Sequence, residues 1–133
     1  MDRLSAWAPR VLSLLRIVTA LLFIEHGLMK LISFPGPVPG MTYPLSAMAI
    51  FAGILETFGG ALVLVGLFTR PVAFILSGEM AVAYFMVHMK MGPWPALNYG
   101  DPAILFCWIF LYLVFAGPGS WTLDARFAKR VEP

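Results

Sequence analysis

The sequence predicts an all-α fold, an integral-membrane four-helix antiparallel bundle, and three observations carry this prediction. The chain has 133 residues, of which 60% are hydrophobic and only 12% are charged, whereas about 25% of the residues in a soluble domain are charged. Its mean hydropathy is +0.85. The apolar residues fall into four segments, each close to the length that crosses a bilayer. Together these features indicate a membrane protein.

The four apolar segments cover about residues 9–33, 45–68, 71–91 and 101–117. A helix rises 1.5 Å per residue and needs about 20 residues to cross about 30 Å of hydrocarbon, so all four are expected to span. The first segment has no small-residue cleavage site behind it, which favours a retained helix over a removable signal peptide. A single domain over residues 1–133 is therefore expected, ending in a short basic tail over residues 118–133.

The connections between the segments differ in length. Phe68-Thr69-Arg70-Pro71 forms a tight link, and proline is tolerated in the first turn of the helix that follows. The second and third segments are therefore expected to be antiparallel neighbours. Residues 34–40 and 92–95 are rich in proline and should form turns, although a lid over an outer cavity is an alternative.

The basic residues predict the orientation of the chain. Two of them, Lys30 and Lys90, fall on one side of a four-span topology, and the others fall on the opposite side. That larger group consists of Arg3, Arg10, Arg16, Arg70, Arg126, Lys129 and Arg130. Because basic residues are retained on the cytoplasmic side, both termini are expected there.

Several ionisable residues lie inside the apolar segments, where a charge costs several kcal/mol and usually marks a working site. They are Glu25, His26, Lys30, Glu56 and Glu79. Small residues share the helical face of Glu56, so this carboxyl is expected inside the bundle, near mid-depth, paired with His26 or Lys30. The alternative for each carboxyl is a neutral or salt-bridged group that only fixes the register of the helices.

Several chemistries have little support in the sequence. Cys107 is the only cysteine, so the chain has no dithiol motif and no cysteine-built metal cage. His26 and His88 lack ligand-spaced partners, so no metal site is predicted and a haem is disfavoured. No cofactor signature is evident, although a quinone could bind. The net charge of only +2 does not suggest nucleic acid as a partner.

An ordered set of motifs resembles the DoxX family over nearly the whole chain. The motifs are His26-Gly27-Leu28-Met29-Lys30, Glu56-Thr57-Phe58-Gly59-Gly60, Gly66-Leu67-Phe68-Thr69-Arg70, Met80-Ala81-Val82-Ala83 and Gly117-Pro118-Gly119-Ser120-Trp121-Thr122-Leu123-Asp124. The resemblance implies a small four-helix protein of the bacterial inner membrane. It also places Arg16, Arg70 and Met80 at family-typical positions, and we assign these three a structural role.

The resemblance implies a connection to redox chemistry, because an archaeal namesake is a subunit of a thiosulfate:quinone oxidoreductase and bacterial relatives are linked to oxidative stress or thiol handling. Our leading hypothesis is a membrane subunit of a quinone-linked or thiol/sulfur-linked redox complex. His26 or Lys30 would bind a quinone carbonyl, and Glu56 would exchange a proton. Because the chain has no signature for a flavin, metal or dithiol, a partner would carry the electrons.

Two alternatives remain at the level of sequence. The first is a non-enzymatic scaffold or chaperone-like module, in which the polar residues only hold the helices together. The second is a component of a proton-coupled transporter. The expected partners are membrane lipids, another protein of a membrane complex, and further copies of the chain.

Overall fold

The computed structural model describes residues 3–131, with side chains described up to residue 128, and its regular structure there is entirely helical. Helix α1 covers Ala8–Ile32, and α2 (Ala47–Ile54) continues through a π-helical turn (Leu55–Gly59) into α3 (Gly60–Val65). Helix α4 (Thr69–Ala83) continues through a second π-helical turn (Tyr84–His88) to Met91. The remaining helices are α5 (Pro95–Asn98), α6 (Asp101–Ala116) and α7 (Leu123–Val131).

Three of these helical segments are long and apolar enough to cross a membrane. They are Ser5–Ile32, Ala47–Val65 and Thr69–Met91. The segment that was predicted as a fourth span forms α6, a shorter apolar helix of 16 residues, which corresponds to about 24 Å at 1.5 Å per residue. Within the predicted basic tail, residues Leu123–Val131 form α7.

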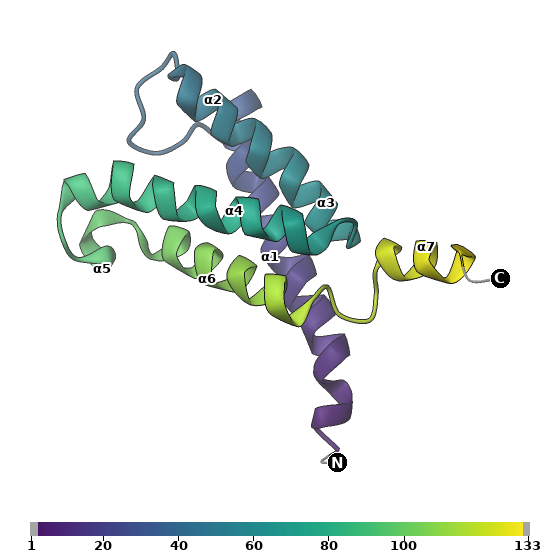
Figure 1. The fold of residues 1–133 in the computed structure, drawn as a ribbon. Helices are drawn as coiled ribbons and strands as arrows, with labels where there is room; N and C mark the ends of the chain where they lie inside the picture. The colour runs from purple at the N-terminus through teal and green to yellow at the C-terminus, as the bar shows by residue number, and fades with distance from the viewer. Residues whose placement is uncertain (1–2, 132–133) are drawn as a thin grey trace.

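The long helices form two pairs that cross (Figure 1). Helices α4 and α6 lie side by side, whereas α1 packs along the segment from α2 to α3 and crosses α4 and α6 at a steep angle. At one end of the fold, α1 and α4 begin and α3 and α6 end, and we call it the arginine end. The opposite end carries residues 33–46 and 92–100, and we call it the loop end. Helix α7 projects away from the arginine end (Figure 1).

The apolar core lies where the two pairs cross. Phe23 of α1 is fully buried, and its ring lies edge-on to Phe106 and Phe110 of α6, with ring centroids 5.1 and 4.8 Å apart. Leu76 of α4 and Val63 of α3 complete this contact from the other two helices. Edge-to-face aromatic pairs add about 0.5–1.5 kcal/mol each to the burial of area, so this cluster fixes how α1 crosses α6.

Glycines allow α1 to approach the neighbouring helix closely. A Cβ atom on Gly27 would lie 2.7 Å from the backbone nitrogen of Thr57, and one on Gly60 would lie 2.7 Å from a side-chain carbon of Ile24. Any larger residue at these positions would push the helices apart. The small-residue face predicted around Glu56 is therefore a packing face, and the prediction that the Glu56 carboxyl lies inside the bundle is confirmed, since the residue is only 2% exposed.

Arg16 connects the helices at the arginine end. Its side chain is buried, and its guanidinium donates hydrogen bonds to the carbonyls of Pro118, Trp121 (2.6 Å) and Leu64 (3.4 Å). Leu64 lies in the last turn of α3, whose carbonyls have no partner within the helix. A single side chain therefore joins α1 to the end of α3 and to the segment that follows α6.

The segment between α6 and α7 carries the remaining contacts of this end. Its backbone nitrogens at Ser120 and Trp121 donate to the Pro9 carbonyl and the Ser13 hydroxyl of α1. Gly119 has a φ of +83°, and a Cβ there would lie 2.7 Å from the Pro9 carbonyl oxygen, so only glycine fits without strain.

Two charged side chains close helix ends at the arginine end. Arg70 donates to the carbonyls of Val114 and Phe115 at the end of α6, at 2.6 and 2.8 Å. The Asp124 carboxylate of α7 accepts hydrogen bonds from the backbone nitrogens of Phe68 and Thr69 at the start of α4, at 3.0 and 3.4 Å. Both contacts satisfy groups that a helix leaves unpaired at its termini, which supports the structural role that the sequence assigned to Arg70.

Asn98 organises the loop end. It is fully buried, its amide donates to the Gly92 carbonyl (2.8 Å), and its side-chain oxygen accepts from the backbone nitrogen of Gly100 (2.8 Å). The His88 ring contacts the Asn98 carbonyl at 2.9 Å. His88 therefore helps to hold the loop between α4 and α6.

Replacing Arg16 with methionine should lower the free energy of unfolding by about 3 kcal/mol, because three carbonyls at the arginine end would lose their donor. Arg10→Met is the matched control, since Arg10 is exposed and stacks only on Trp7, and should change stability by about 1 kcal/mol or less. Unfolding of both variants can be followed by circular dichroism in mixed micelles. Equal stability of the two would contradict the assigned role of Arg16.

Candidate functional site

The predicted ion pair forms between Lys30 and Glu56. The Lys30 ammonium contacts both carboxylate oxygens of Glu56 at 2.5 Å, and the side chains are 15% and 3% exposed. It is the one salt bridge within the part of the chain whose side chains are described. Of the two partners that the sequence offered for Glu56, the structure therefore selects Lys30 over His26.

The local backbone explains how Lys30 reaches Glu56. A Cβ on Gly53 would lie 2.9 Å from the Cβ of Lys30, so the absence of a side chain at Gly53 lets Lys30 cross α2. Glu56 lies in the π-helical turn Leu55–Gly59, where the wider turn changes the direction in which side chains leave the helix. π-Helical turns inside α-helices are often found at functional sites.

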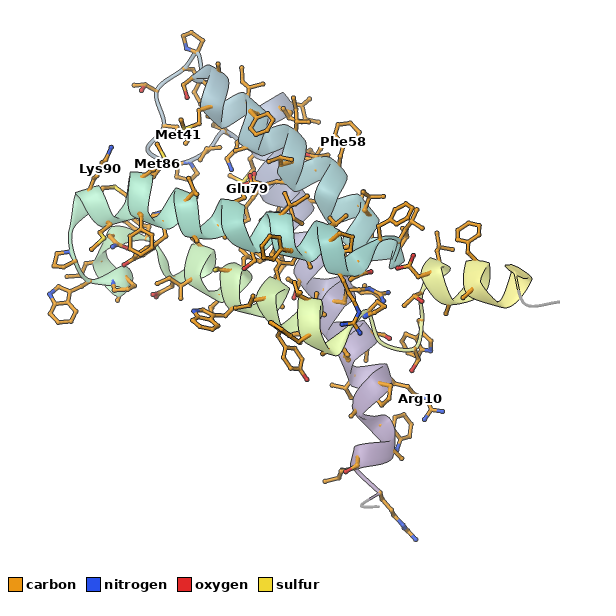
Figure 2. All side chains as sticks on the ribbon, in the orientation of Figure 1. Arg10, Met41, Phe58, Glu79, Met86 and Lys90 are labelled. Carbon is orange, nitrogen blue, oxygen red and sulfur yellow. The ribbon has the colours of Figure 1, made fainter. Side chains whose placement is uncertain are left out.

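Glu79 of α4 is the third member of this group. Figure 2 shows Glu79 on the side of α4 that faces α2 and the loop end of α1. Both of its carboxylate oxygens are buried, and neither has a hydrogen-bond partner. The carboxyl group lies within electrostatic range of both Glu56 and Lys30. We call Lys30, Glu56 and Glu79 the polar cluster.

The charge of the polar cluster does not balance by itself. Two carboxyl groups face one ammonium group, so the fully ionised cluster would carry one net negative charge inside an apolar environment, where an unpaired charge costs several kcal/mol. One additional proton or one hydrogen-bond donor from a ligand would satisfy it. The cluster can therefore accept a proton or bind a polar group within the membrane.

The other predicted site residues lie outside the polar cluster. Glu25 and His26 are both exposed on α1, and the His26 ring lies edge-on to Phe106 with centroids 5.8 Å apart. Met80 is buried in the apolar core. Two open depressions in the surface lie at the arginine end, one beside Arg70 and one beside Arg16, and neither is lined by the polar cluster.

Sequence reasoning missed Asn98 and Asp124 as residues that hold the structure. Asn98 is followed two positions later by Gly100, a spacing typical of a side chain that binds its own backbone. Asp124 lies two residues after Thr122, in the first turn of α7. The Thr122 hydroxyl accepts a hydrogen bond from the backbone nitrogen of Ala125 and so caps this helix. In residues 3–128, no group of three or more His, Cys, Asp or Glu side chains is placed to hold a metal ion.

Replacing Lys30 with methionine should lower the free energy of unfolding by about 3–5 kcal/mol, because Glu56 would be left buried without its cation. Combining Lys30→Met with Glu56→Leu should restore most of this loss, since the double variant no longer buries the Glu56 carboxylate without its cation. Lys90→Met, at an exposed position, is the control and should stay within about 0.5 kcal/mol of the wild type. If the double variant is no more stable than Lys30→Met, the destabilisation does not come from an unpaired Glu56.

Comparison with known proteins identifies relatives along the whole chain. The model of the DoxX family matches residues 11–89. A Haemophilus influenzae protein named "Uncharacterized protein" is 42% identical over 98% of this chain and 100% of its own length. The Escherichia coli "Inner membrane protein YphA" is 32% identical over 89% of this chain and 91% of its own.

A third relative carries a name that refers to an activity. The Bacillus subtilis protein named "Putative oxidoreductase CatD" is 34% identical over 84% of this chain and 82% of its own length. No solved structure is significantly similar to the chain. From its family match, its relatives and its apolar helices, the chain belongs to the DoxX family and is a multi-pass protein of the bacterial inner membrane.

Proposed function

We propose that this protein is the membrane subunit of a redox complex and that its polar cluster binds a quinone or a similar small amphipathic ligand. The observation that carries the proposal is the buried carboxyl of Glu79, which has no hydrogen-bond partner and lies beside the Lys30–Glu56 ion pair. The relative named an oxidoreductase supports the choice of a redox role over other uses of such a site.

The cluster offers the groups that a quinone requires. The Lys30 ammonium is a donor for a quinone carbonyl, and it is partly exposed, so a ligand can reach it. Reduction of a quinone to a quinol takes up two electrons and two protons, and a buried carboxyl is a suitable proton donor at such a site. In the proposal Glu79 donates the two protons one after the other and takes up a proton from water between the two transfers, whereas Glu56 holds Lys30 in place.

The electrons would come from a partner. Cys107 is the only cysteine, so its thiol has no second cysteine in the chain with which to form a disulfide. Ser77 donates a hydrogen bond to the Cys107 carbonyl at 2.8 Å. Thiol or sulfur chemistry, like quinone reduction, would therefore need a soluble or membrane-bound subunit with its own flavin, metal or dithiol. That subunit is the protein partner we propose.

A scaffold or chaperone-like role is the second candidate, and the Lys30–Glu56 pair favours it. This pair joins α1 to the π-helical turn of the neighbouring helix and is neutral overall, so it could serve only to hold the two helices together. Such a role accounts for Lys30 and Glu56 but gives no reason for the unpartnered carboxyl of Glu79. For this reason the ligand-binding role is preferred.

We also propose that four helices span the membrane and that both termini lie in the cytoplasm. The arginine end carries Arg16 and Arg70, with Arg126 in the adjoining α7, whereas the loop end carries Lys30 and Lys90. Helix α6 is short for a span, but it lies alongside α4 over its length, and a thinner local bilayer can accommodate it at modest cost.

Reporter fusions test this orientation. A green fluorescent protein fused after Pro133 should fluoresce, because it folds in the cytoplasm, and alkaline phosphatase fused after Gly92 should be active, because it needs the periplasm. Active phosphatase at the C-terminus would show that the orientation is reversed or that the number of spans is odd.

Binding of a short-chain ubiquinone analogue to the purified protein tests the proposed site. Glu79→Gln and Glu56→Gln should each weaken binding by about tenfold to a hundredfold, since the first removes the carboxyl that donates to the quinone and the second removes the anion that holds Lys30 in place. Glu25→Gln is the matched control, because Glu25 is an exposed carboxyl in the same apolar region, and it should bind like the wild type. Isothermal titration calorimetry in detergent provides the affinities.

The proteins must first be shown to be monodisperse and helical. If the folded wild type does not bind the analogue, the quinone-binding role fails and the scaffold role is favoured. If all three variants bind equally well, the ligand binds elsewhere and the polar cluster is not the site.

A further inference from the structure

We propose that two copies of this chain associate in the membrane through the exposed face of α1, with Glu25 of one copy against Glu25 of the other. This inference does not depend on the proposed quinone site. It rests on the position of Glu25, which is exposed on the outside of the fold within a membrane-spanning helix.

Glu25 cannot easily avoid the hydrocarbon. It lies seven residues before the end of α1 at Ile32, which is about 10 Å along the helix axis. A glutamate side chain is too short to cover that distance to the headgroups, unlike the long side chains of lysine and arginine. The one salt bridge among residues 3–128 joins Lys30 to Glu56, so Glu25 has no ionic partner there. Ionisable groups at such depth normally face protein or water rather than lipid.

The residues on the same face of α1 follow a seven-residue repeat. The first position of the repeat is occupied by Val11, Val18, Glu25 and Ile32. The second position, three residues later, is occupied by Leu14, Leu21 and Leu28. Leu28 is partly exposed, and the other residues of the repeat are exposed. The exposed fraction of the five exposed valine, leucine and isoleucine residues is 50–67%. The face therefore forms a continuous strip along the helix, which we call the α1 seam.

The pattern of the α1 seam favours a second copy of this chain over a different protein. β-Branched residues at the first position with leucine at the second are typical of parallel two-stranded helix pairs. Two copies in one membrane share one orientation, so a two-fold axis along the membrane normal makes their α1 helices parallel. Leucine and valine can face lipid without cost, whereas the carboxyl of Glu25 cannot. One polar residue in such a seam fixes the register of the two helices and the number of helices that associate.

The two-fold axis brings each first-position residue against its own counterpart. The two Glu25 carboxyls would therefore meet, and a proton held between them would form a hydrogen bond that crosses the interface. Glutamine can make an equivalent hydrogen bond, whereas leucine cannot. The two substitutions therefore separate the hydrogen bond from the shape of the seam.

Disulfide cross-linking of the full-length chain in phosphatidylethanolamine–phosphatidylglycerol vesicles tests the proposal. The experiment uses a Cys107→Ala background, so that the chain contains only the introduced cysteine. Val18→Cys lies in the α1 seam and should form a covalent dimer on oxidation. Phe74→Cys, an exposed position on α4 (65% exposed), is the control and should remain monomeric. Both sites are exposed, so neither substitution should disturb the packing of the chain.

The Glu25 variants are then compared in the Val18→Cys background as the vesicles are diluted with lipid. Glu25→Leu should weaken association by about threefold to tenfold, the effect expected for one interhelical hydrogen bond in a membrane, and Glu25→Gln should retain it. The proposal would be overturned if Val18→Cys stayed monomeric or if Phe74→Cys cross-linked equally well. It would also be overturned if the Glu25→Leu variant associated as strongly as the wild type. Monomeric Val18→Cys in the purified protein would mean that something other than a second copy covers Glu25.

Discussion

The buried guanidinium of Arg16 is the interaction on which the arrangement of the helices depends. It donates to carbonyls at the end of α3 and in the segment after α6, so three parts of the chain meet at one side chain of α1. The guanidinium is buried, so these carbonyls replace the water that would otherwise accept its hydrogen bonds. These hydrogen bonds hold this end together while α1 crosses α6 at a steep angle (Figure 1).

The crossing of the two helix pairs brings polar side chains from both pairs together toward the loop end. Lys30 and Glu56 join α1 to the neighbouring helix, while Glu79 approaches them from α4, which belongs to the other pair. The polar cluster therefore lies between the two helix pairs. A contact of this kind responds to any change in how the pairs are placed, so a ligand that binds Glu79 would also affect the packing of α4 against α1 and α2.

The sequence predicted the helices better than their relative orientation. Their approximate bounds follow from apolar length, and the burial of Glu56 follows from the small residues Gly53 and Gly60 on its face. The sequence left His26 and Lys30 as alternative partners of Glu56, and the structure pairs Glu56 with Lys30 while His26 is exposed. The sequence could not predict how α1 crosses α6, because that crossing involves contacts of Phe23 with Phe106 and Phe110, which are distant in sequence.

The three intramembrane glutamates differ in what satisfies them. Glu56 has Lys30 as its partner, Glu79 is buried without a partner, and Glu25 points out of the fold. Lys30 and Glu25 lie five residues apart on α1, which corresponds to about 140° around the helix. A second copy packed on Glu25 would therefore lie on a different side of α1 from the polar cluster. Association through the α1 seam would leave the cluster free to bind a ligand or to accept a proton, so each copy in such a dimer would keep its own site.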